Sequence, residues 1–160
     1  MKNKKKIFSL NGIELQKYQP NRYPFLMIDY VTAVNPGVSA EGYKNFTNNE
    51  WFFPIHFPNR PNVPGALQLE ALAQMLTVAI TTLPNLKGKV THALSHVVKF
   101  KREILPGEKF EIKTTVNSWS RGICVGRGTG YVNGELACEA DMTITIPEIL
   151  EQYLPKNNLR

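Results

Sequence analysis

The chain has few cysteines, few histidines and no long apolar run. Two cysteines and three histidines occur among its 160 residues. Cys124 and Cys138 lack the spacing of a zinc site or a CxxC redox motif, so we expect two reduced thiols. The longest apolar stretch, 71–80, includes Gln74 and Thr77 and is far shorter than a membrane span. The N-terminus also lacks the apolar core of a signal peptide, and we expect a cytoplasmic protein without membrane attachment.

The net charge is positive, but its distribution does not indicate nucleic-acid binding. Lysine and arginine number 19 and the acidic residues 13, which gives a formal net charge of +6. Part of this excess lies in residues 1–8, which we expect to form a flexible basic tail. Lys99, Lys101 and Arg102 form a smaller basic group, and no nucleic-acid motif accompanies it. A small basic patch of this kind suits an acidic protein partner.

The length and the composition predict a single domain over residues 1–160. Apolar residues make up 42% of the chain and charged residues 20%, which is typical of a globular protein rather than a disordered one. Four prolines within 54–64 exclude a helix or a central strand from that segment. Pro64-Gly65 then begins a helix that we expect to reach about Leu83. Its apolar residues cover every face, which predicts a buried helix.

The segments around this helix predict a sheet that would cover it. Four strands are predicted after the helix, at 97–101, 109–119, 123–132 and 136–146. Asn133-Gly134, between the last two, is a strong hairpin signal. Two strands are predicted before the helix, at 25–31 and 39–47, and short helices at 13–18 and 147–154, with a tail to residue 160. A long central helix wrapped by a curved antiparallel sheet is the α+β arrangement called the hotdog fold.

One histidine and one glutamate are the leading functional candidates, because these residue types serve most often in general acid–base catalysis. His56 lies in the proline-rich loop, and Glu70 follows fourteen positions later inside the apolar helix. Burial disfavours the charged form of a carboxyl group, so a buried Glu70 would act as a proton donor. Two structural alternatives stay open: His56 as a solvated loop residue, and Glu70 hydrogen-bonded to Gln74 one turn later.

Other candidate residues give weaker signals. His92 and His96 approach an expected strand without an acidic or cysteine cluster nearby, so no metal site is predicted. Ser95 lacks the strand–turn–helix setting of an activated nucleophile. We therefore expect any chemistry to depend on His56 and Glu70.

Several short motifs occur in order along the chain and form a specific combination. They are Arg22-Tyr23-Pro24-Phe25-Leu26, Asn45-Phe46-Thr47 with Asn49-Glu50, His56-Phe57-Pro58, Pro61, Pro64-Gly65, Leu69-Glu70-Ala71-Leu72-Ala73-Gln74, Val98-Lys99-Phe100 and Pro106-Gly107. With these motifs the sequence, from about Ile13 to Ile146, resembles the 3-hydroxyacyl-acyl-carrier-protein dehydratase family of fatty-acid synthesis.

The resemblance implies a lyase that converts a 3-hydroxyacyl thioester into the trans-2-enoyl thioester. The substrate would be carried on the phosphopantetheine arm of an acyl carrier protein, without a metal or a separate cofactor. His56 and Glu70 would be the catalytic pair, brought together from two subunits at a dimer interface. The protein would then be a homo-oligomer, either a dimer or a trimer of dimers.

The elimination requires a base, an acid and a hydrogen-bond donor. His56 would remove the proton from C2, and Glu70 would protonate the leaving hydroxyl at C3. The N–H of Gly65, at the positive end of the helix, would stabilise the charge on the thioester oxygen. Phe57, Ile55 and Gln74 are expected at the substrate, and Lys99, Lys101 and Arg102 at the acidic carrier protein.

One departure from the family pattern lies beside the histidine. Ile55 stands where the family usually has glycine, so either the loop backbone differs or the pocket is narrower. A narrower pocket predicts short or unusual acyl groups. Two other classes of function stay open: an acyl thioesterase of the same fold, in which a carboxylate activates water, and a non-catalytic acyl-binding module.

Overall fold

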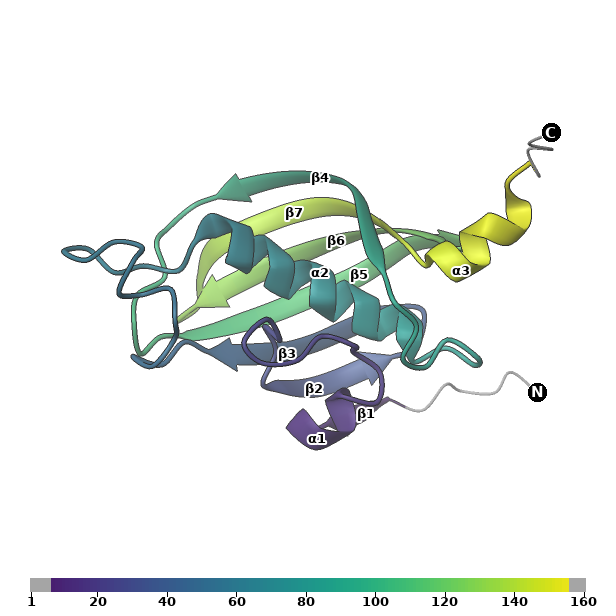
Figure 1. The fold of residues 1–160 in the computed structure, drawn as a ribbon. Coiled ribbons are helices and arrows are strands. Elements are labelled where there is room, and N and C mark those ends of the chain that lie inside the picture. The colour runs from purple at the N-terminus through teal and green to yellow at the C-terminus, as the bar shows by residue number, and fades with distance from the viewer. Residues whose placement is uncertain (1–6, 156–160) are drawn as a thin grey trace.

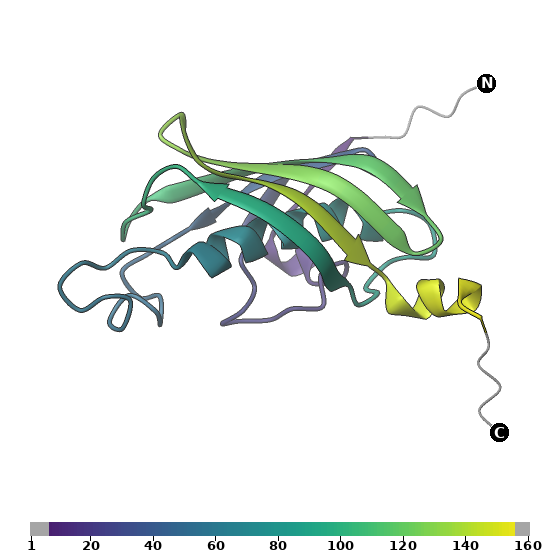
Figure 2. The ribbon, with the colours of Figure 1, turned by 90° about the horizontal axis from the view of Figure 1, so that it is seen from above.

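One long helix lies against a large curved sheet in the computed structural model, which describes residues 7–155 (Figure 1). The elements are β1 (Phe8–Leu10), α1 (Gly12–Leu15), β2 (Tyr30–Asn35), β3 (Ser39–Asn45), α2 (Gly65–Thr81), β4 (His92–Phe100), β5 (Lys109–Ser120), β6 (Ile123–Val132), β7 (Glu135–Thr145), α3 (Pro147–Leu150) and a 3₁₀ turn (Glu151–Tyr153). The seven strands are all antiparallel and follow the order β1-β2-β3-β5-β6-β7-β4. The sheet curves over α2 (Figure 2). This is the predicted α+β hotdog fold.

The prediction is most accurate where local patterns are strong. Strand β6 has the predicted bounds, 123–132, and α2 ends two residues before the predicted limit at Leu83. The hairpin between β6 and β7 turns at Asn133 and Gly134, with φ values of 51° and 81°. Both angles lie in the left-handed region that an Asn-Gly hairpin turn uses.

The predicted strand at 25–31 is wrong over most of its length. Strand β2 begins only at Tyr30 and continues to Asn35. The preceding backbone is bound by a side chain instead, because the Met27 N–H donates to Oε1 of Gln74 at 2.8 Å. Nε2 of Gln74 donates to the Phe25 carbonyl oxygen at 2.7 Å. These groups are therefore satisfied without a neighbouring strand.

The two ends also differ from the expectation. Residues 1–6 of the predicted basic tail lie outside the described residues, but Phe8 already belongs to β1, which pairs with β2. The predicted strand at 97–101 begins earlier, at His92. At the C-terminus a short α3 and a 3₁₀ turn replace the longer helix expected over 147–154, and residues 156–160 lie outside the described range.

Glycines on β6 allow α2 to lie close to the sheet. A Cβ atom on Gly126 would come within 2.6 Å of Leu76, and one on Gly128 within 3.0 Å of Leu72. Alternate residues of a strand point to the same face, so both glycines leave the surface beneath the helix without side chains. Leu72 and Leu76 are fully buried as a result.

The second half of α2 is buried all round, whereas the first half is not. Every residue from Gln74 to Thr81 is buried. Ala66, Leu69, Glu70 and Ala73 follow helical spacing and form a stripe that the sheet leaves partly open. The predicted burial on every face therefore applies only to the second half. Among residues 7–155 no helix combines the length and apolar character needed to cross a membrane.

Both cysteines are fully buried free thiols on β6 and β7. Burial raises the pKa of Cys124 to about 12 and that of Cys138 to about 12, because the interior disfavours the thiolate. We expect neither thiol to react with a disulfide reagent in the native protein at about pH 8, since only the thiolate attacks. Both should react once the chain is unfolded in guanidinium, which serves as the positive control. Rapid reaction of the native protein would show that the core at β6 and β7 opens.

Candidate active site

The loop between β3 and α2 is anchored by buried groups before it reaches His56. Phe52 is buried and packs edge-on against Phe46, with ring centroids 6.0 Å apart. Nζ of Lys44 lies 2.8 Å from Oε1 of Glu50 and 3.3 Å from Oδ1 of Asp29. Ion pairs that are largely removed from water fix geometry more than they add stability. Together these contacts hold the start of the loop against β2 and β3.

The ring of His56 is oriented by the backbone of its own loop. Its Nδ1 lies 3.1 Å from the carbonyl oxygen of Asn62, and the Asn62 N–H donates to the His56 carbonyl oxygen at 3.0 Å. A carbonyl oxygen can only accept, so Nδ1 of the neutral ring carries the proton and Nε2 keeps its lone pair. Half-buried His56 also stacks on Phe57. A general base needs this tautomer.

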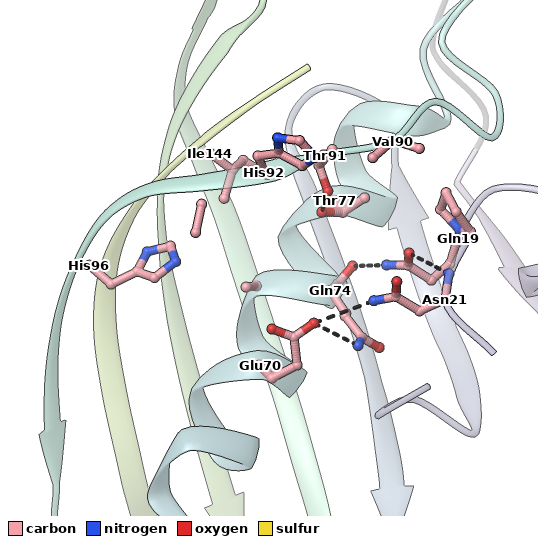
Figure 3. Close-up of a pocket in the computed structure, with 13 residues that line it drawn as sticks. Gln19, Asn21, Glu70, Gln74, Thr77, Val90, Thr91, His92, His96 and Ile144 are labelled. Atoms are coloured by element: carbon pink, nitrogen blue, oxygen red, sulfur yellow. Dashed lines mark hydrogen bonds between the residues drawn. The ribbon is translucent and has the colours of Figure 1, made fainter. Parts of the chain in front are cut away.

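Glu70 has one engaged carboxyl oxygen and one without a hydrogen bond. Its Oε1 accepts from Nε2 of Gln74 at 2.8 Å and from Nδ2 of Asn21 at 3.4 Å (Figure 3). The hydrogen bond to Gln74, considered above as a structural alternative, is therefore formed, but Oε2 has no partner among residues 7–155. The side chain is half-buried, less than the sequence predicts. Glu70 is held in place with one oxygen available.

A pocket beside Glu70 lies between α2, β4 and the segment that precedes β2 (Figure 3). Its polar lining includes Glu70 and Gln74 from α2, Asn21, and His92 and His96 from β4. The cavity has a volume of about 80 Å³. His56 does not line this pocket. Within one chain, the two predicted catalytic residues therefore do not share it.

The N-terminus of α2 opens onto a second hollow, which is lined by Gly65, Gln68 and Phe100 among others. The Gly65 N–H has no hydrogen-bond partner among the described residues. A Cβ atom at this position would lie 2.8 Å from the Phe100 ring, so a larger residue would require that ring to move. The predicted donor is therefore a free amide at the start of a 17-residue helix.

Ile55 and Phe57 flank His56 with side chains that are 64% and 55% exposed. The φ angle of Ile55 is not in the left-handed region, where the described non-glycine residues are Asn85, Arg121 and Asn133. The backbone at this position therefore does not require glycine. Neither side chain lines the pocket beside Glu70, so Ile55 does not narrow the pocket of its own chain.

The three predicted carrier-binding cations have different surroundings. Arg102 is half-buried and binds Glu108 at 2.7 Å and Glu135 at 3.0 Å. Lys101 is exposed and lies 3.9 Å from Glu139. Lys99 is exposed and has no ion-pair partner within the described range. Arg102 therefore joins loops within the chain, whereas Lys99 and Lys101 are the cations available at the surface.

His96 is a pocket residue that the sequence analysis missed. The predicted strand began at Val97, so His96 lay outside it, but β4 begins at His92. In the register of β4 with β7, His96 lies opposite the buried Met142 and therefore points inward. The sequence around His96 carries no signal for the inward face, which is set by the pairing of β4 with β7. No cluster of three or more potential metal ligands occurs among the described residues, His92 and His96 included.

Comparison with known proteins first defines the class. Residues 19–141 match the FabA-like domain family. The relatives are more specific: the 3-hydroxyacyl-[acyl-carrier-protein] dehydratase FabZ of Alkaliphilus metalliredigens is 41% identical over 86% of this chain and 94% of its own length. That of Bacillus velezensis is 40% identical over 87% of this chain and 99% of its own. The chain therefore belongs to the 3-hydroxyacyl-acyl-carrier-protein dehydratase family, as its motifs indicate.

Solved structures confirm the hotdog fold at low sequence identity. The dehydratase heterocomplex ApeI:P from Xenorhabdus doucetiae matches with a TM-score of 0.70 and 14% identity, over 89% of this chain and 97% of that one. A putative thioesterase from Ralstonia eutropha matches with a TM-score of 0.56 and 21% identity, over 72% and 83%. The fold is thus shared by proteins named for different reactions, and it does not by itself decide the activity.

Gln74 connects Glu70 to the segment before β2, and its removal should destabilise the fold. In Gln74→Ala the Met27 N–H and the Phe25 carbonyl lose their partner, so we expect a loss of about 2–3 kcal/mol in the free energy of unfolding. Urea denaturation at fixed protein concentration measures it. Gln16→Ala is the matched control, because Gln16 is exposed and its change should stay within about 0.5 kcal/mol. Equal losses in the two variants would contradict a special role for Gln74.

Proposed function

We propose that the protein removes water from a 3-hydroxyacyl thioester carried on an acyl carrier protein and produces the trans-2-enoyl thioester. His56 is the base and Glu70 the acid. The observation that carries this assignment is the hydrogen bond between Nδ1 of His56 and the Asn62 carbonyl, which leaves Nε2 free to take a proton. Family membership and the names of the relatives support the substrate class.

The chemistry needs only groups that the chain supplies. Nε2 of His56 takes the C2 proton, and the electron pair of that bond moves toward the thioester carbonyl. The Gly65 N–H, at the positive end of α2, stabilises the negative charge that develops on the oxygen. The C3–O bond then breaks as Glu70 gives its proton to the hydroxyl, and a double bond and one water molecule result. No electrons are gained or lost overall, so the reaction needs no redox cofactor.

We propose further that each site combines His56 of one subunit with Glu70 of another. His56 does not line the pocket beside Glu70 of its own chain. Strand β4 is a sheet edge whose Leu94 and Val97 are 52% and 62% exposed. The stripe of α2 that includes Glu70 is also partly exposed to solvent. A second copy paired along β4 would protect both features, in a dimer or a trimer of dimers.

Incubation with a short 3-hydroxyacyl thioester tests the activity. A dehydratase produces the absorbance of a conjugated enoyl thioester, a thioesterase releases a free thiol, and a binding module does neither. We expect His56→Ala and Glu70→Gln each to lower turnover at least about a hundredfold, the low end of general acid–base contributions. Unchanged dehydration in either variant would remove that residue from the mechanism. Circular dichroism should show that both variants fold.

Co-expression of the two inactive variants tests the shared site. In a mixed dimer, intact His56 comes from the Glu70→Gln chain and intact Glu70 from the His56→Ala chain, so one of the two sites is complete. Random pairing should therefore restore about a quarter of the parental activity. Each variant co-expressed with itself is the control and should stay inactive. If the mixture recovers nothing, the site lies within one chain.

Docking of the acidic carrier should depend on Lys99 and Lys101. Reversing both charges should raise the KM for the carrier-linked substrate several-fold and spare a small thioester, because only the carrier is attracted over distance. The effect should weaken as salt rises. Lys113→Glu is the matched control, an exposed lysine on β5. Equal losses on both substrates would contradict carrier docking at this surface.

A further inference from the structure

The pocket beside Glu70 is lined along α2 by residues that lie two helical turns apart. Glu70 and Thr77 are both lining residues, and their spacing places them on one face of the helix, about 10 Å apart along its axis. Figure 3 shows Glu70 on one turn of α2 and Thr77 further along the helix, near Thr91. The pocket therefore extends from the candidate acid toward the segment that precedes β4.

A hydrogen bond between two threonines closes the end of the pocket that lies away from Glu70. Oγ1 of Thr77 lies 2.9 Å from Oγ1 of Thr91, and this contact joins α2 to the segment that precedes β4. Both residues line the pocket; Thr77 is buried and Thr91 is half-buried. A chain that follows the pocket away from Glu70 meets the side chains of this pair.

The backbone on both sides of Thr91 is held by other contacts. His92, the next residue, pairs with Thr145 of β7 in the sheet. On the other side, Nζ of Lys89 lies 2.5 Å from Oε1 of Glu148 on α3. The position of Thr91 therefore depends on the sheet and on α3 as well as on its hydrogen bond to α2.

The proposed chemistry places the tail of the substrate in this pocket. Glu70 gives its proton to the hydroxyl at C3, so C3 lies at the Glu70 end. The thioester carbonyl and C2 must lie at Gly65 and His56, and neither residue lines this pocket. The remaining part of the substrate, from C4 onward, is a hydrocarbon chain, and the wall includes the apolar side chains of Ala73 and Ile144.

The size of the cavity limits the length of this tail. Its volume is about 80 Å³, and a water-sized group such as a methylene needs about 10–15 Å³ of cavity volume. This leaves room for about six carbons beyond C3. The distance of about 10 Å from Glu70 to Thr77 gives a similar limit, because an extended chain with C–C bonds of about 1.5 Å advances about 1.3 Å per carbon.

We propose that Thr77 and Thr91 determine the acyl-chain length of the substrate: the hydrogen-bonded pair ends the acyl pocket and restricts the protein to 3-hydroxyacyl groups of up to about nine carbons. The inference rests on the proposed dehydratase function, for which it names the substrate range. The limit is separate from Ile55, which does not line this pocket. A tail that is too long by one methylene lowers kcat/KM about tenfold or more.

The dependence of kcat/KM on chain length tests this assignment. A series of 3-hydroxyacyl thioesters that grows in steps of two carbons, from about four to about fourteen, gives the length at which kcat/KM falls. For the parental protein we expect a fall of about tenfold or more at about ten carbons.

Substitutions at the end of the pocket should move this limit in both directions. Thr77→Ala and Thr91→Ala each remove two side-chain atoms, so kcat/KM for the first rejected length should rise about tenfold while the four-carbon substrate stays within about threefold. Thr91→Leu fills the end of the pocket and should move the limit about two carbons shorter. Thr82→Ala is the matched control and should keep the parental limit, because Oγ1 of Thr82 donates to the Val78 carbonyl and does not line the pocket.

The outcomes separate this inference from the proposed function. A limit that stays at the parental length in both alanine variants, or that moves equally in Thr82→Ala, would overturn the role of the threonine pair. Thermal unfolding checks that each variant folds, and Thr91→Ala keeps the test decisive if Thr77→Ala disturbs the helix. Absence of dehydration by the parental protein at every length would instead overturn the proposed function itself.

Discussion

The structure depends on how closely α2 packs into the concave face of the sheet. Burial of a large aliphatic side chain such as Leu72 or Leu76 contributes about 1.5–3 kcal/mol, and both lie over glycines of β6. A side chain at Gly126 or Gly128 would push the helix outward. The same packing sets the rotation of the helix, and the rotation places Glu70 on the partly open side. Core packing and site position are therefore one constraint.

The two leading candidate residues are held by different means. Glu70 lies on a rigid helix, where Gln74 and Asn21 fix one of its oxygens. His56 lies in a loop, where the backbone of Asn62 fixes the ring and the prolines limit the chain. Loops carry function best when a rigid scaffold positions them, and here the scaffold is buried at Phe52 and at the Lys44 ion pairs. Both groups are oriented before a substrate binds.

The sequence predicted what depends on local pattern and missed what depends on distant partners. The helix from Gly65 and the β6–β7 hairpin follow from periodicity and turn residues. Residues 25–28 have strand-forming side chains, but the Met27 N–H and the Phe25 carbonyl are satisfied by Gln74, 47 positions from Met27. Which residues of β4 point inward likewise depends on the register of β4 with β7. The sequence around His96 does not reveal that register. His56 and Glu70 could be named as candidates because their residue types and their setting are locally unusual.

The buried polar groups that the fold leaves unsatisfied are few, and they lie near the candidate site residues. Among residues 7–155 only two buried side-chain atoms lack a hydrogen-bond partner, Oε1 of Gln68 and Nδ1 of His96. Gln68 lines the hollow at the start of α2 with Gly65, and His96 lines the pocket with Glu70. Each unsatisfied atom costs about 1–3 kcal/mol of folding free energy. Natural proteins that satisfy their other buried groups accept such a cost mainly at functional sites. Both exceptions thus lie beside groups that the proposed reaction uses, and the fold accepts its few unsatisfied groups at the candidate site rather than in the core between α2 and the sheet.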